Sequence, residues 1–332
     1  MVGRVIEALA TQGDPDLGVL GLLPGVWENT GALTGHGWNI IALPFGHSGQ
    51  LGDFRLLLNQ FNETLTFSVV DKHVPNRGDN HVDQHVATLQ YIQHIAQLAA
   101  IDAASTAAGG LTIPATPDTD DTPKTNTLPP PGNGPANIHH EPGLLLRFES
   151  QTGNGPTLGR LASIPHGDSV LALGHSIAQH PGAPNFNNPS FAGLFSSLPV
   201  GVGGATVNGQ PNPYLAPYKH FTGANKFLGL LDATDPRALL AAAVAPATVT
   251  HTTTIILSTE VTDGGIHNVP FVTRKANATS LAIAIWVQEL NDGTKVLQYV
   301  QKVMLKFFPR ADHVAGLIEW PHISFNSLIL QP

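Results

Sequence analysis

Apolar and polar residues alternate with a period of two along most of the chain. In the segment 61–70, Leu65, Phe67 and Val69 fall on one face, while threonine and serine occupy positions between them. This alternation is typical of antiparallel strands that bury one face. It predicts strands at 37–45, 55–61, 61–70, 83–98, 143–150, 158–164, 169–174, 250–260, 279–290, 296–308 and 317–330.

Helical periodicity is scarce by comparison. The segment 83–100 has apolar residues that also satisfy a helical spacing, but its alternation favours a strand. Only 234–245 predicts a helix well, because Asp235 can cap it and Pro236 can occupy its first turn. We therefore expect an all-β protein with one short helix near 235–245.

The order of these strands predicts one closed antiparallel sheet, with residues 1–332 as a single domain. About ten mostly sequential strands joined by Gly-, Asn- and Pro-containing turns suit a β-barrel of the lipocalin or fatty-acid-binding-protein type, with room for one ligand. Two insertions interrupt the strands, at 109–137 and 178–226. The first is rich in Pro, Thr and Asp and predicts a solvated loop. The second contains enough Phe, Leu and Tyr to pack as a lid over the barrel mouth.

Composition narrows the range of partners. Apolar residues make up 42% of the chain, enough for a sizeable core, and the net charge of −8 comes without a basic stripe for nucleic acid. The absence of cysteine excludes disulfides and thiolate metal sites. No apolar run approaches the ~18 residues of a membrane span, and the first residues lack the apolar core of a signal peptide. We expect a cytoplasmic protein that binds a small molecule, without membrane or nucleic-acid partners, and we leave a homodimer open.

Sixteen histidines make this residue type the main candidate for chemistry, because imidazole binds metals and haem iron and transfers protons near neutral pH. In 317–330, alternation puts Trp320, His322 and Ser324 on one face. Pro321 lacks the N–H that a sheet ladder requires, so we expect a bulge or a seam next to His322. Periodicity alone favours His322 as a barrel-wall residue.

Other histidines stand in shorter motifs. His139 and His140 are consecutive, so in an extended segment at most one of them faces the interior. His166 lies in a Pro-His-Gly kink that can aim its imidazole at a fixed point. His81 and His85 would share a strand face but lie roughly 13 Å apart, too far for one metal ion. A structural role at a strand entry or turn explains these residues as well.

The remaining motif, at 21–31, indicates a structural role, and common catalytic signatures are missing. In 21–31, small residues flank Trp27, which suits a tightly bent strand whose indole plugs the barrel floor. The sequence contains no Gly-x-Ser-x-Gly elbow, no His-Glu-x-x-His motif and no phosphate-binding glycine loop. Common hydrolase, zinc-protease and nucleotide-binding signatures are therefore missing.

Taken in order, the motifs resemble those of the nitrobindins, a family of haem-binding β-barrels. Residues 22–31 resemble the family's Leu-Leu-Gly-x-Trp-x-Gly-x-Gly opening, and 139–144 resemble its His-x-Glu-x-Gly-aromatic segment, with leucine replacing the aromatic residue. Residues 164–167 resemble its Ala-His-Pro-x-Gly segment, with His and Pro reversed. The segments 74–78, 139–143, 164–167 and 320–322 are also similar to a larger bacterial and fungal group of haem-binding β-barrel proteins.

This resemblance implies that haem b binds inside the barrel, with His322 in the position of the histidine that ligates iron and His166 as the rival ligand. It implies an activity on reactive oxygen or nitrogen species, either peroxynitrite isomerisation or peroxide-dependent oxidation of a small apolar substrate. In the peroxide reaction, His166 would act as a base and Arg77 or Arg147 as the cation. The expected cofactor contacts are His322, Trp320, Ser324, Trp27, Trp38, His139 and His140.

Two alternatives use the same fold without haem. One is a carrier of a fatty acid or another apolar ligand, which needs none of the histidines. The other is a non-haem metalloenzyme in which His139 or His140, together with His166 and Glu141, holds a metal on one wall. The sequence leaves open whether the protein is an enzyme and, if so, whether it is a peroxidase, a peroxygenase or a peroxynitrite isomerase.

Overall fold

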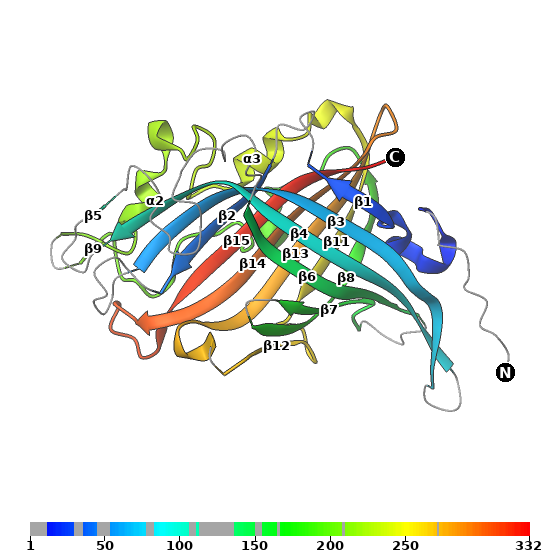
Figure 1. Cartoon of the computed structure of the whole chain (residues 1–332), viewed down its shortest axis with the longest axis horizontal. Helices are drawn as coiled ribbons and strands as arrows, with labels where there is room; N and C mark the ends of the chain where they lie inside the picture. The colour runs from blue at the N-terminus through cyan, green and yellow to red at the C-terminus, as the bar shows by residue number, and fades with distance from the viewer. Residues whose placement is uncertain are drawn as a thin grey trace.

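The chain is built mainly from β-strands, with a few short helices (Figure 1). The computed structural model describes residues 12–29, 36–44, 54–77, 83–105, 111–112, 136–149, 155–164, 167–207, 210–270 and 272–332. The all-β prediction is confirmed, and so is the strand interpretation of 83–98.

Ten antiparallel strands close into a barrel, as the alternation predicts. They are β2 (Gly37–Leu43), β3 (Phe54–Arg77), β4 (Asp83–Ser105), β6 (Ala136–Phe148), β7 (Leu158–Ile164), β8 (Asp168–Pro181), β11 (Val249–Ser258), β13 (Asn277–Leu290), β14 (Lys295–Pro309) and β15 (Leu317–Leu330). The order around the barrel is β3-β2-β15-β14-β13-β11-β8-β7-β6-β4, and the pairing of β4 with β3 closes the ring. Every neighbouring pair in this ring is antiparallel.

Five short strands complete the sheets. They are β1 (Gly25–Glu28), β5 (Leu111–Thr112), β9 (Thr206–Val207), β10 (Gln210–Pro211) and β12 (Gly265–Asn268). Both β1 and β2 lie between β3 and β15, with β1 pairing with β3 at 64–67 and β2 at 55–61. Most of the insertion predicted at 109–137 lies outside the described residues, apart from β5 and the first two residues of β6.

The helical elements are all short. They are η1 (Pro15–Leu22), α1 (Pro189–Ala192), α2 (Ala216–His220), η3 (Gly223–Asn225), α3 (Arg237–Ala242), η4 (Pro246–Thr248) and η5 (Val272–Arg274). The helix predicted near 235–245 corresponds to α3. In the described part of the chain, no helix has the length and apolar character needed to cross a membrane.

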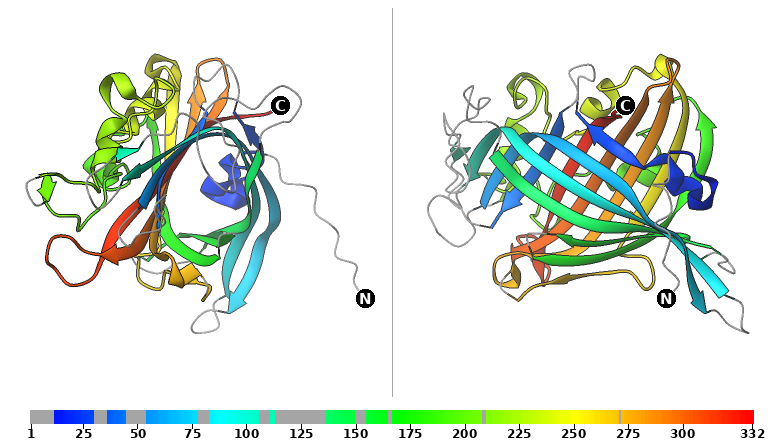
Figure 2. Two further views of the ribbon diagram at one scale, coloured as in Figure 1. Left: turned by 60° about the vertical axis from the view of Figure 1, so that its left-hand side comes forward. Right: turned by 45° about the vertical axis from the view of Figure 1, so that its right-hand side comes forward.

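One end of the barrel is closed from within by the N-terminal residues. The short helix η1 lies across this opening (Figure 2), and its Leu17 is fully buried in the same apolar cluster as Leu65 of the wall. Trp27 joins this cluster, and its indole N–H donates a hydrogen bond to the carbonyl of Leu23 over 2.8 Å. This position agrees with the plugging role that the sequence motif predicts for Trp27.

Residues 182–207 and 210–248, which lie between β8 and β11 in the chain, pack against the outside of the barrel (Figures 1 and 2). We call them the covering segment. Three of its phenylalanines surround Trp286 of β13, with ring centroids 4.9, 5.2 and 6.4 Å from the indole: Phe186, Phe191 and Phe195. The wall beneath the covering segment therefore has apolar contacts on its outer face as well as its inner face.

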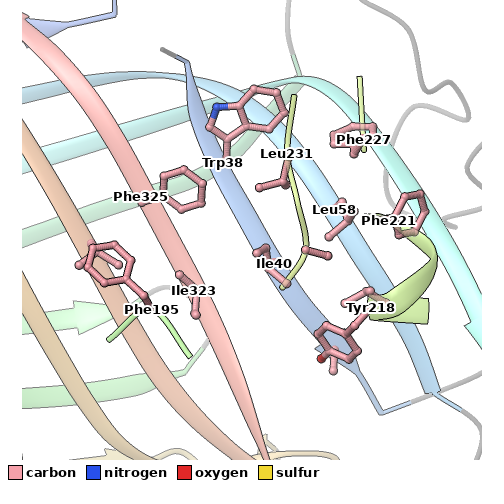
Figure 3. Close-up of a cluster of buried hydrophobic side chains, with 14 of the residues drawn as sticks. Trp38, Ile40, Leu58, Phe195, Tyr218, Phe221, Phe227, Leu231, Ile323 and Phe325 are labelled. Atoms are coloured by element: carbon pink, nitrogen blue, oxygen red, sulfur yellow. The ribbon is translucent and has the colours of Figure 1, made fainter. Parts of the chain in front are cut away.

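The same layer covers β2 and β15 (Figure 3). Ile323 and Phe325 of β15 pair directly with Ile40 and Trp38 of β2, and all four side chains are buried. Phe227 of the covering segment packs edge-on against Trp38 with ring centroids 6.0 Å apart. These contacts form one continuous cluster between the wall and the covering segment.

The lid predicted from the composition of 178–226 is wrong in its placement. Residues 178–181 complete β8, and the apolar side chains that follow contact the side of the barrel. The physical reason is that β13 and β15 carry apolar residues at both alternate sets of positions, including Trp286 and Phe325. An outer face of this kind must be covered.

We expect Phe195→Ala to lower the free energy of unfolding by about 3–5 kcal/mol, because the phenylalanine is buried against the wall and its truncation leaves a cavity. Leu230→Ala, in the same segment but 48% exposed, is the matched control and should change stability by less than about 0.5 kcal/mol. Urea unfolding measures both. Equal, small effects would contradict the packing of the covering segment on the barrel.

Candidate functional site

The inner wall is defined by residues that face one another across the barrel. Six side chains from six strands border a cavity of about 40 Å³: Leu65, Tyr91, Leu145, Arg160, Ile285 and Tyr299. Tyr299 of β14 lies directly opposite Asn326 of β15. Because alternate residues of a strand share a face, Ser324 and His322 also line the interior.

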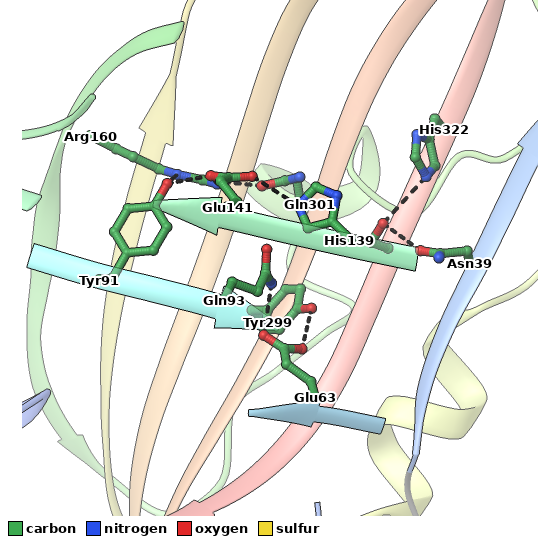
Figure 4. A network of polar contacts seen from close by, with 11 residues as sticks. Asn39, Glu63, Tyr91, Gln93, His139, Glu141, Arg160, Tyr299, Gln301 and His322 are labelled. Carbon is green, nitrogen blue, oxygen red and sulfur yellow. Dashed lines mark hydrogen bonds and ion pairs between the residues drawn. The ribbon is translucent and has the colours of Figure 1, made fainter. Parts of the chain in front are cut away.

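His322 ends a row of polar side chains that crosses four strands on this inner wall. Asn59 of β3 donates a hydrogen bond to Gln97 of β4, and Asn39 of β2 donates to Asn59 over 3.3 Å. Ser324 donates to the Asn39 side-chain carbonyl over 2.6 Å, and its hydroxyl oxygen lies 3.5 Å from Nε2 of His322 (Figure 4). We call these five residues the polar row. It fixes Ser324 and directs its oxygen toward the imidazole.

A buried carboxyl group lies next to this row. Glu63 accepts hydrogen bonds from Tyr299, Asn326 and Gln93, each over 2.7 Å. Burial raises the pKa of Glu63 above its ordinary value, although the three donors and nearby His139 act in the opposite direction. Burial thus favours the protonated form of Glu63 more than that of an exposed glutamate.

The second interior carboxyl group has an arginine partner. The Arg160 guanidinium, itself buried, donates to Glu141 over 2.6 Å, to the Tyr91 hydroxyl over 2.8 Å and to Gln301 over 2.5 Å. Burial alone would raise the pKa of Glu141, but the charge of Arg160 and hydrogen bonds from His139 and Tyr91 lower it to about 2. This carboxylate stays ionised, and its other oxygen lies 3.2 Å from Nε2 of His139.

The two carboxyl groups thus have opposite properties within one interior. The charge of Arg160 favours the ionised form of Glu141, whereas burial favours the protonated form of Glu63. Both contact tyrosines whose pKa burial raises further above the ordinary value, so Tyr91 and Tyr299 remain hydroxyl donors. The cavity between them has room for about three water molecules, and one side of it is apolar. The arrangement can bind and orient a small polar group and exchange one proton with it.

The structure brings three of the predicted site residues to this interior. They are His322 and His139 (Figure 4), and Ser324, which lies 3.5 Å from His322. His140 points the other way, since it is exposed and its ring lies 4.1 Å from that of His94. This is the alternation that the consecutive histidines predict.

Each of the three predicted tryptophans makes contacts that stabilise the fold. Trp320 donates its indole N–H to the Phe307 carbonyl over 3.0 Å and packs against Phe54, which belongs to the cluster shared with the covering segment. Trp38 lies on the outer face of β2 in that cluster, and Trp27 plugs one end of the barrel. Of the three, Trp320 is nearest to His322 in sequence and belongs to the same strand, β15.

Of the three predicted catalytic residues, only Arg147 has a side chain in the described part of the structure. Arg147 forms an ion pair with Glu149 and donates to the Asp16 carbonyl over 3.3 Å, so it lies at the end closed by η1. Arg77 is the last residue of β3, and its side chain lies outside the described part of the structure. His166 also lies outside the described residues.

Arg160, Glu63, Tyr91 and Tyr299 were not singled out from the sequence, although two of them carry a signal. Glu63 shares a face with Leu65 and Phe67 in the alternation of β3. Arg160 likewise shares a face with the apolar residues of β7. A single charged residue on an otherwise apolar strand face indicates a buried charge with a partner.

Comparison of the chain with protein-family models, curated proteins and solved structures finds no match. The likeness to nitrobindins therefore stays a prediction that rests on short motifs.

We expect Arg160→Met to lower the free energy of unfolding by about 3–5 kcal/mol, because it leaves the Glu141 carboxylate buried without its cation. The double variant Arg160→Met with Glu141→Gln removes both charges and should recover more than half of this loss. Chemical denaturation of the two variants tests the pair. A double variant no more stable than the single one would contradict the ion-pair assignment.

Acid should destabilise the protein through Glu141. Its pKa of about 2 in the folded state lies below the ordinary 4.5, so its stabilisation is complete above pH 4.5 and is lost as pH falls toward 2. Glu63, with a raised pKa, gains a proton at higher pH and works in the opposite direction. Urea midpoints at pH 7, 4.5 and 3 should fall below pH 4.5 in the wild type and less steeply in the double variant. An equally steep fall of the urea midpoint in the wild type and the double variant would contradict this role of Glu141.

Proposed function

We propose that the barrel binds haem b in its interior, with His322 as the axial ligand. The observation that carries the proposal is the inward position of His322 at the end of the polar row, where Ser324 lies 3.5 Å from its Nε2. A polar partner of this kind orients an imidazole. The sequence resemblance supports haem as the identity of the ligand.

The donor set fits this cofactor. Haem iron is commonly held by a neutral imidazole, and its surroundings determine the reactivity of the open side. His322 supplies the imidazole, while His139 and the Arg160 guanidinium offer partners for polar ligands within the same interior. The nearby cavity of about 40 Å³ is far smaller than a porphyrin. Haem binding therefore requires interior side chains to move apart.

With haem bound, the iron would supply the redox chemistry toward a small oxygen or nitrogen species. The chain's own residues would orient that species and transfer a proton to or from it. Arg160 and the hydroxyl groups of Tyr91 and Tyr299 are donors, and Glu63 is the carboxyl group whose protonated form burial favours. We propose these residues for that role. His166 and Arg77 stay predictions, because neither side chain is among those described, and Arg147 is paired with Glu149.

Titration of the purified protein with hemin tests the proposal. We expect a stoichiometric shift of the Soret band in the wild type and at least a 10-fold weaker affinity in His322→Ala, because the metal–imidazole bond is lost. His140→Ala is the matched control, since its imidazole is exposed on the opposite face of β6 from His139, and it should bind hemin like the wild type.

Two results would overturn the proposal in different ways. A wild type without a Soret shift excludes haem binding. Weakened binding in His139→Ala combined with full binding in His322→Ala moves the axial ligand to the opposite wall.

A haem-free carrier of a small amphipathic ligand is the second candidate. The observation that favours it is the composition of the cavity, where Leu65, Leu145 and Ile285 face Arg160 and Tyr299. A ligand with an apolar body and a polar end matches such a lining. This candidate predicts that the purified protein binds a fluorescent fatty-acid probe, that unlabelled fatty acid displaces the probe, and that added hemin gives no Soret shift.

A further inference from the structure

The hairpin of β3 and β4 extends past the barrel at the end closed by η1 (Figures 1 and 2). At its base the register of the pair shifts between Asp71 and Val74, so β3 has one more residue than β4 there. The Asp71 carboxylate accepts a hydrogen bond from the backbone N–H of His73 over 2.9 Å and holds this bulge. A bulge of this kind redirects a side chain, and here the side chain is His73.

The redirected imidazole lies on a second one. The rings of His73 on β3 and His85 on β4 are stacked, with centroids 3.5 Å apart and planes 13° from parallel. Oε2 of Glu149, the residue after β6, lies 3.9 Å from Nδ1 of His73. The ligand atoms of His73, His85 and Glu149 all lie within 4.8 Å of one another.

The carboxylate of Glu149 is held in place by groups that leave one oxygen toward the histidines. The backbone N–H of Glu149 donates to the His85 carbonyl over 2.8 Å. Its Oε1 forms an ion pair with Arg147, which donates in turn to the Asp16 carbonyl over 3.3 Å. Arg147 is thus a positioning residue for Glu149, comparable to the outer partners that orient the ligands of metal sites.

We propose that His73, His85 and Glu149 bind one divalent transition-metal ion of the zinc type. Two imidazole nitrogens and one carboxylate oxygen form a ligand set that Zn²⁺ and Co²⁺ favour. With bonds of about 2.0–2.2 Å, ligand atoms around one ion lie roughly 3.4 Å apart. Rotation of the exposed His73 side chain, with smaller movements of the half-buried His85 and Glu149, closes the present distances. Three protein ligands leave at least one coordination position for water or a substrate.

This site is separate from the barrel interior and from the residues predicted for a non-haem metalloenzyme. It joins strands β3, β4 and the end of β6, so a bound ion would tie the projecting hairpin to the barrel wall. Metal that binds only the folded state stabilises it. We therefore expect added metal to protect this end of the barrel against unfolding.

Titration of the full-length, haem-free protein with Co²⁺ after chelator treatment tests the site. The wild type should bind one equivalent with visible absorption typical of nitrogen and oxygen ligands, and Zn²⁺ should displace it and raise the melting temperature. His73→Ala, His85→Ala and Glu149→Gln should each weaken Co²⁺ binding more than about 10-fold. Arg147→Met should weaken it less than these three, because it removes only the orienting partner.

His94→Ala is the matched control. His94 and His140 form the other close pair of histidine rings, 4.1 Å apart, but no carboxylate completes a third ligand with them among the described residues. This variant should bind Co²⁺ like the wild type. The proposal fails if the wild type binds no stoichiometric Co²⁺, or if the three ligand variants bind it as tightly as the wild type does. Since hemin is absent, neither result depends on the interior site.

Discussion

Closure of the sheet by the pairing of β4 with β3 is the constraint on which the rest of the structure depends. Glu63 of β3 illustrates this, because it contacts Gln93 of β4 across the closing pair and Tyr299 of β14 in the other direction around the ring. In a closed barrel no edge is left to hydrogen-bond with solvent or another chain. The interior can therefore contain charged groups that an open sheet would expose to water.

Those charged groups are balanced within the barrel. Arg160 has five N–H donors in a planar fork, and its contacts with Glu141, Tyr91 and Gln301 employ all three of its nitrogen atoms. Such an arrangement fixes the tyrosine and glutamine side chains around the cavity more firmly than apolar packing would. The interior is thus preorganised for polar recognition, while β3, β6 and β13 supply its apolar side.

Strand periodicity predicts the barrel well, because strands such as β3 and β7 bury one alternate set of residues. Leu65 and Phe67 of β3 identify the inner face without any structural information. The outward packing of the covering segment could not be predicted in the same way. Its Phe195 is as apolar as any lid residue, and its position depends on Trp286, which is distant in sequence.

In the candidate site, too, some features follow from strand periodicity and others depend on contacts between residues distant in sequence. The inward position of His322 follows from alternation along β15, and the opposite directions of His139 and His140 follow from their being neighbours. The pairing of Glu141 with Arg160 depends on the lateral order of β6 and β7. The sequence pairs His85 only with His81, four residues away. The stacking of His85 on His73 depends on a bulge that no periodicity predicts.

The two-sided burial of β15 has a consequence for the fidelity of folding. A slip of one residue in the register of this strand would turn Phe325 into the barrel and His322 toward the covering segment. With solvent outside, only the interior would oppose such an error. Here the pairing of Ile323 with Ile40 beneath the covering segment opposes it from the outside too. Packing on both faces of β15 thereby fixes the register that turns the His322 imidazole into the barrel.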